Sequence, residues 1–164
     1  MKSRIGNRAG GEPIDFRYRI FRTRPLGSGA GVTSSPSLIS SVQELRTFLS
    51  GAHISWQWAD QSVSELVDAY DEHYFEDHVL VAGVVSAGSG STRVNITGVS
   101  RTEEFLTVIF QLDRPAIGTA DMMSWHYFVE IGSSDAGDLP LNINLPITRG
   151  NQNRGGRGWT VADR

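Results

Sequence analysis

A nearly continuous apolar run, His-Val-Leu-Val-Ala-Gly-Val-Val at residues 78–85, constrains the fold more than any other feature of the sequence. Its length is that of a strand, and apolar residues without alternation are typical of a strand covered on both faces. Two alternating segments follow at residues 92–100 and 105–112, each after a short turn. Strands joined by such short turns predict an antiparallel meander.

Further strands are predicted on either side of this region. Residues 14–23 and 122–131 alternate between two faces, which is the pattern of a strand with one buried face. Residues 36–40 could form a short strand. Two prolines confine a last strand, at residues 139–148, to the edge of a sheet.

Two helices are predicted from capping boxes, in which a Ser side chain accepts an early backbone N–H and a Glu three residues later returns to the cap. The Ser-x-x-Glu patterns that begin at Ser41 and Ser62 are each followed by an apolar stripe at helical spacing. We therefore expect helices near 42–50 and 62–74, the first of which ends at Gly51.

These elements predict one α+β domain. Its sheet should be twisted and mainly antiparallel, could curl toward a barrel, and is packed by the two helices. A chain of 164 residues is long enough for one such domain with a core of its own. We place the domain at residues 14–148, between a flexible N-terminal segment at 1–13 and a disordered Gly- and Arg-rich tail at 149–164.

The net charge of −3 is distributed unevenly along the chain. Residues 1–24 carry seven basic and two acidic side chains, and residues 149–164 carry four basic and one acidic. Residues 25–148 carry four basic and fifteen acidic side chains. An acidic body repels phosphates, which argues against nucleic acid as the main partner. Weak nucleic-acid binding through the basic termini stays open as an alternative.

The chain contains no cysteine, which excludes disulfides, thiolate zinc sites and a cysteine nucleophile. No apolar run approaches the ~18–20 residues of a transmembrane helix, so we expect no membrane segment. The basic N-terminus lacks the apolar stretch of a signal peptide. We expect a soluble, cytoplasmic protein, and an exported form whose leader has been removed is also compatible with the composition.

Candidate functional residues concentrate in the segment 119–131. Alternation places Trp125 on one face of the predicted strand and His126 on the other. Because the face of Trp125 is apolar, we expect this side chain to anchor the core. We expect His126 to be half exposed, which makes it the main functional candidate of this strand.

Other polar residues of the same segment could act with His126. Thr119 and Asp121 precede the strand and are expected to fix its entry loop by hydrogen bonds, whereas Glu130 shares the face of His126. Ser124 also shares that face, but such neighbours on one strand lie ~7 Å apart, too far for a direct Ser–His hydrogen bond. We therefore assign no catalytic residue.

An acidic stretch at residues 68–78 contains several carboxylates and two imidazoles, which raises the question of a metal site. His73 and His78 stand five residues apart, and the stretch lacks a His-Glu-x-x-His pattern. We interpret the stretch as a solvated outer face, with His78 at the boundary of the apolar strand. No metal ligand and no cofactor is predicted.

Trp56 and Trp58 lie in residues 52–61, which we predict to be an irregular loop. The two side chains could form an exposed patch for a partner protein, or they could fold inward over the edge of the sheet.

From about residue 20 to residue 131, the chain resembles a family of small, functionally uncharacterised bacterial proteins of clostridial type. It is distantly similar to the C-terminal domain of the protease-complex subunit PrcB. The resemblance rests on the order and spacing of several pieces: Ser41-Val-Gln-Glu-Leu45, Tyr70-Asp-Glu-His-Tyr-Phe75, Gly88-Ser-Gly-Ser91, Leu106-Thr-Val108 and Gly118-Thr-Ala-Asp-Met122 with Trp125-His126. The family supplies no catalytic residues. The likeness to PrcB implies a module that binds or stabilises a protein partner.

The leading hypothesis is therefore a non-enzymatic protein-interaction or stabilising domain. It predicts an exposed apolar patch or an unprotected sheet edge. The rival hypothesis is a small-ligand-binding protein or hydrolase that uses His126 with Asp121, Glu130 or the 68–78 stretch. It predicts a concave pocket in which at least two of these side chains converge.

Overall fold

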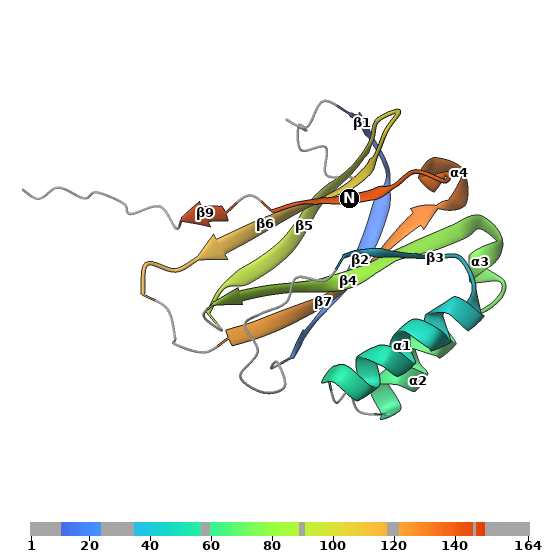
Figure 1. Ribbon diagram of the computed structural model, residues 1–164, viewed down its shortest axis with the longest axis horizontal. Helices are drawn as coiled ribbons and strands as arrows, with labels where there is room; N and C mark the ends of the chain where they lie inside the picture. Colours follow the sequence, from blue (N-terminus) through green and yellow to red (C-terminus); the bar gives the residue numbers. More distant parts are fainter. Residues whose placement is uncertain are drawn as a thin grey trace, which may run out of the picture.

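Two β-sheets and a helical layer make up the part of the chain that the computed structural model describes (Figure 1). The α+β fold class and its packing by helices are confirmed. The strands divide between two sheets, however, and neither sheet closes into a barrel. The described residues are 11–23, 35–56, 60–88, 91–117, 122–145 and 147–149.

The inner sheet forms the middle layer and has four antiparallel strands. Its order is β2 (Phe16–Thr23), β7 (Met122–Gly132), β4 (His78–Gly88) and β3 (Ser37–Ile39). Residues 79–85 of β4 are all buried, which confirms the prediction of a strand covered on both faces. The helices cover one of these faces and the second sheet covers the other (Figure 1).

The outer sheet contains β1 (Glu12–Pro13), β5 (Arg93–Arg101), β6 (Leu106–Arg114), β8 (Leu141–Asn144) and β9 (Ile147–Arg149). β1 and β6 flank β5 in antiparallel pairing, whereas β8 and β9 pair with β6 in parallel. The predicted meander is therefore wrong for its first strand, because β4 and β5 belong to different sheets, whereas β5 and β6 form the predicted antiparallel pair. β4 is apolar on both faces and needs cover on each, whereas β5 alternates and can face solvent.

The N-terminal boundary of the fold also differs from the expectation. Glu12 and Pro13, within the segment predicted to be flexible, pair with Arg101 and Ser100 of β5. Residues 1–10 and 150–164 lie outside the described part of the chain.

The main core fills the space between the two sheets. Trp125 is buried in it, as predicted, together with the alternate residues of β7 and β4 that face the outer sheet. Tyr127 packs edge-on against Phe110 of β6, with 4.9 Å between the ring centroids. Alternation along β7 therefore assigns its two faces correctly.

The helical layer consists of α1 (Val42–Trp56), α2 (Asp60–Ala69) and the single turn α3 (Tyr74–Asp77). A further single turn, α4 (Ser133–Ala136), lies apart from this layer, and its buried residue Ala136 belongs to the core between the two sheets (Figure 1). A second core lies between the helices and the inner sheet, and its buried members are Ile39, Leu45, Leu49, Leu66, Tyr70, Leu80, Ala82 and Phe128. Among the described residues, no helix is both long enough and apolar enough to cross a membrane.

The helix boundaries differ from the sequence prediction. The first capping box forms in part: the Glu44 N–H donates to the Ser41 hydroxyl at 3.2 Å, while the Glu44 carboxylate accepts the Ser40 N–H at 2.7 Å. α1 then continues through Gly51 to Trp56, because a glycine inside a helix costs only about 1 kcal/mol and does not by itself end the helix. α2 begins at Asp60, so Ser62 is the third residue of the helix and does not occupy the position that precedes it.

Candidate functional site

A polar cluster of four residues lies where β2 and β7 meet the chain that follows α2. Its members are Arg19, Tyr70, Tyr74 and Glu130. The register places Glu130 of β7 opposite Arg17 of β2 and Leu80 of β4, so its side chain points toward the helical layer. The Tyr70 hydroxyl donates to Glu130 Oε1 at 2.9 Å, and Arg19 Nε lies 3.8 Å from the same oxygen. The carboxylate therefore joins the inner sheet to the chain that leaves α2.

Arg19 also contacts Tyr70 through the ring face. The guanidinium carbon lies 5.2 Å from the ring centroid, within the range of a cation–π contact. Tyr70 is buried, whereas the Arg19 side chain is 47% exposed, so one side of the guanidinium faces solvent. Arg19 thus covers a buried aromatic ring and presents charge at the surface.

Tyr74 extends the aromatic part of the cluster. Its ring lies edge-on against Tyr70, with centroids 4.9 Å apart, and stacks on His78 at 5.0 Å. The Tyr74 hydroxyl is buried and has no hydrogen-bond partner among the described residues. Burial and the charge of Glu130 raise the pKa of Tyr74. Burial and the hydrogen bond to Glu130 likewise raise the pKa of Tyr70, so both phenols stay neutral at ordinary pH.

The expectation of a half-exposed His126 is wrong, because this side chain is only 1% exposed. It lies on the helix-facing side of β7, and its cross-strand neighbours are Phe21 and Val84. Burial lowers the pKa of His126 to about 4, so the imidazole is neutral at physiological pH. The sequence identifies the face on which His126 lies, but not how deeply that face is covered.

His126 and Glu130 share a face of β7 but do not converge. Four residues along a strand span ~13 Å, too far for the two side chains to act on one group. Thr119 and Asp121, the other predicted partners of His126, lie outside the described residues. The described part of the chain therefore does not bring His126 together with Glu130.

A serine pair beside His126 was not predicted. Ser86 and Ser124 are directly opposed in β4 and β7, and their hydroxyl oxygens lie 2.8 Å apart. Ser124 is fully buried, so the contact satisfies polar groups inside the fold. No local pattern in the sequence indicates this pair, because the contact depends on the register of β4 against β7.

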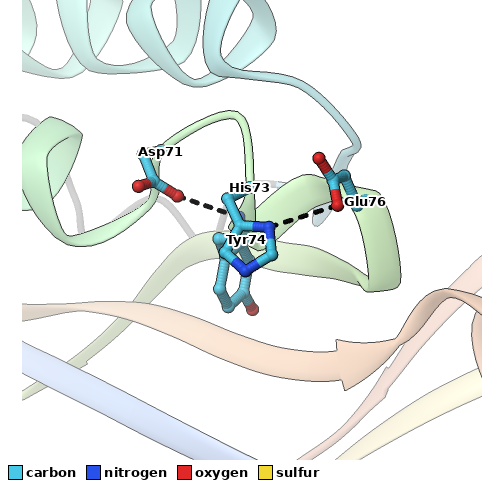
Figure 2. A network of polar contacts seen from close by, with 4 residues as sticks. All are labelled: Asp71, His73, Tyr74 and Glu76. Carbon is cyan, nitrogen blue, oxygen red and sulfur yellow. Dashed lines mark hydrogen bonds and ion pairs between the residues drawn. The ribbon is translucent and has the colours of Figure 1, made fainter.

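The polar side chains of the acidic stretch at residues 68–78 make hydrogen bonds within the stretch itself. Figure 2 shows Asp71 Oδ1 accepting the Tyr74 N–H at 2.9 Å, and His73 Nδ1 lying 3.1 Å from Glu76 Oε2. The carboxylates of the stretch are exposed, as the solvated-face interpretation predicts, and His78 is exposed at the start of β4. Among the described residues, no group of three or more His, Cys, Asp or Glu side chains could hold a metal ion.

Trp56 and Trp58 are the predicted partner surface, and the structure describes only the backbone of Trp56. Trp56 is the last residue of α1, which corrects the prediction of an irregular loop from residue 52. The placement of its side chain, and all of Trp58, lie outside the described part of the structure.

The edge of the inner sheet beside the polar cluster is formed by β2. In the described part of the chain, β2 pairs along all eight residues with β7 on one side, and it stands last in the strand order. Tyr18 is 38% exposed on this strand and stacks on Phe16, with 6.2 Å between the ring centroids. Arg17 and Arg19 are exposed on the same strand. This edge combines aromatic surface, positive charge and main-chain groups that point away from β7.

Comparison with known proteins adds no relative. No family model matches the chain, and neither the curated proteins nor the solved structures provide a match. The resemblance to the PrcB C-terminal domain therefore stays a prediction.

Removing the Tyr70 hydroxyl tests the polar cluster. Tyr70→Phe is expected to lower the free energy of unfolding by about 1–2 kcal/mol, because a hydrogen bond to a charged group is lost while Glu130 stays partly buried. Urea unfolding followed by circular dichroism measures the change. Tyr74→Phe is the matched control: its hydroxyl has no partner among the described residues, so the loss should be below about 0.5 kcal/mol. Equal losses in both variants would contradict the assigned role of Glu130.

Proposed function

We propose that this chain is a protein-interaction domain without catalytic activity, and that the edge of β2 receives an extended segment of a partner protein. The observation that carries the proposal is an eight-residue edge strand with two exposed aromatic residues and three exposed arginines. In strand addition, main-chain hydrogen bonds supply affinity and alternate side chains supply specificity.

The shape of the edge supports this proposal. Natural sheets protect their edges with short strands, charged side chains, bulges or covering elements. β3, at the other end of the inner sheet, has three residues, whereas β2 has eight and pairs with β7 without a register shift. The polar cluster on the helix-facing side of β2 stabilises the position of this strand, because Arg19 and Glu130 connect β2 to Tyr70.

Two expectations from the sequence belong to the same proposal. The likeness to the PrcB C-terminal domain implies a module that binds or stabilises a partner protein, which is compatible with an edge strand that recruits one. A cytoplasmic location is also part of the proposal, since a sequence without cysteine needs no oxidising compartment.

A peptide library tests the proposal. Immobilised protein should select peptides of six or more residues from a randomised library, and these peptides should slow amide hydrogen exchange in residues 16–23. Amides of β4, which β7 and β3 already flank, serve as the internal control and should change little. Selected peptides that protect another surface, or a library that yields no binder, would contradict the proposal.

A further inference from the structure

The charge on β2 contrasts with that of the rest of the body. Between Phe16 and Thr23 the strand carries three arginines and no acidic side chain. Residues 25–148 carry fifteen acidic and four basic side chains. β2 is therefore a cationic edge on an acidic body, and a ligand with negative charge would be attracted to this edge and repelled elsewhere.

The side chains of β2 alternate between two chemistries. Arg17 and Arg19 point to the helix-facing side, as their register with Glu130 and Phe128 shows. Tyr18 lies between them and points to the opposite side, where its ring stacks on Phe16. Side chains directly opposed across antiparallel strands lie about 4.5–5.5 Å apart at Cβ, so a strand added to β2 would place alternate residues against arginine and tyrosine.

Arg19 has N–H groups that its contact with Glu130 does not use. A guanidinium carries five N–H groups, and the ion pair of Arg19 with Glu130 uses one nitrogen at 3.8 Å, which is long for a hydrogen bond. Glu130 shows that a carboxylate is accommodated beside Arg19. A second carboxylate, arriving from the open side of β2, could form the paired hydrogen bonds that arginine makes with carboxylates.

We propose that the partner segment is an acidic strand in which glutamate or aspartate alternates with apolar residues. The acidic side chains pair with Arg17 and Arg19, and an apolar side chain between them packs on Tyr18. This inference rests on the proposed function and names the chemistry of the partner. A second copy of β2 does not fit, because like charges directly opposed across two strands destabilise the pair.

Binding of defined peptides tests the inference. A capped hexapeptide of alternating glutamate and valine is titrated into the whole protein while amide shifts of residues 16–23 are followed by NMR. We expect the acidic peptide to bind at least about tenfold more tightly than its lysine–valine counterpart, and its affinity to fall as salt is raised. Acidic peptides N-methylated on alternate amides, in both registers, are the backbone control, and at least one register should lose binding.

Variants at Arg17 identify the surface. Arg17→Gln should weaken the acidic peptide, and Arg17→Glu should weaken it further by about tenfold or more. Arg46, exposed on α1, provides the matched control in Arg46→Gln, which should leave the affinity unchanged. Circular dichroism verifies that each variant is folded. Arg17→Gln keeps the test valid if Arg17→Glu unfolds through repulsion by Glu130, which lies opposite.

The two proposals fail in different ways. Library peptides that protect residues 16–23 but are neutral or basic would overturn the acidic-strand inference and leave the interaction function standing. A library that protects no residue of β2 would overturn both. Equal binding of acidic and lysine peptides, or equal binding of all the N-methylated forms, would overturn the inference alone.

Discussion

Replacing Gly83 by alanine is expected to lower the free energy of unfolding by about 3 kcal/mol, the upper range for an overpacked core. Gly83 of β4 lies directly opposite Tyr127 of β7, whose ring occupies the space that a side chain would fill. An added Cβ would lie 2.5 Å from the Tyr127 hydroxyl oxygen and 2.8 Å from Cζ. Tyr127 is fully buried and packs against Phe110, so it has little room to move. Urea unfolding measures the loss.

Two further variants make the Gly83 prediction specific. In Gly98→Ala the new Cβ would meet the Ile109 side chain at 3.4 Å, an ordinary contact, so the change should stay within about 0.5 kcal/mol. Tyr127→Phe removes a buried hydroxyl that has no partner among the described residues, and should be neutral or stabilising. Combined with Gly83→Ala it should recover part of the loss, because the closest clash is gone. Strictly additive effects would argue against this contact.

Acidification is expected to destabilise the fold through His126. Burial lowers the pKa of His126 from 6.5 to about 4, so between these values the unfolded chain binds a proton that the folded chain does not. The stability associated with neutral His126 is complete above pH 6.5 and declines as the pH falls toward 4. The loss amounts to roughly 2 kcal/mol at pH 5 and about 3 kcal/mol at pH 4.

His126→Gln separates this effect from the titration of carboxylates. Glutamine stays neutral, so the variant should lose less stability than the wild type when the pH is lowered from 7 to 5, whatever its stability at pH 7. The comparison uses free energies of unfolding in urea at both pH values. His73→Gln, at an imidazole whose side chain is 86% exposed, is the matched control for the same substitution at the surface. Identical pH dependence in His126→Gln and wild type would contradict the assignment.

Local patterns predicted the strands better than they predicted the strand partners. Alternation along 122–131 placed Trp125 on the core side and His126 on the other, and both assignments hold. The apolar run at 78–85 correctly indicated a central strand. These features depend on side-chain spacing along one strand, which is present in the sequence itself.

The partners of each strand required the folded chain. β4 pairs with β7 and β3 instead of with β5, because each sheet needs the other to cover its apolar face. The end of the first helix was also misplaced, since the local preference of Gly51 costs only about 1 kcal/mol and does not end α1. Short-range signals therefore fail where burial depends on residues far along the chain.

The candidate site shows the same division. The sequence by itself determined that β2 is an alternating strand rich in arginine, and that Glu130 and His126 share one face of β7. Only the tertiary structure decided that Arg19, Tyr70 and Glu130 meet, and that β2 lies at an edge. The physical reason is that a side-chain pattern specifies a face within one strand, whereas the contacts of that face depend on which distant strands and helices are packed against it.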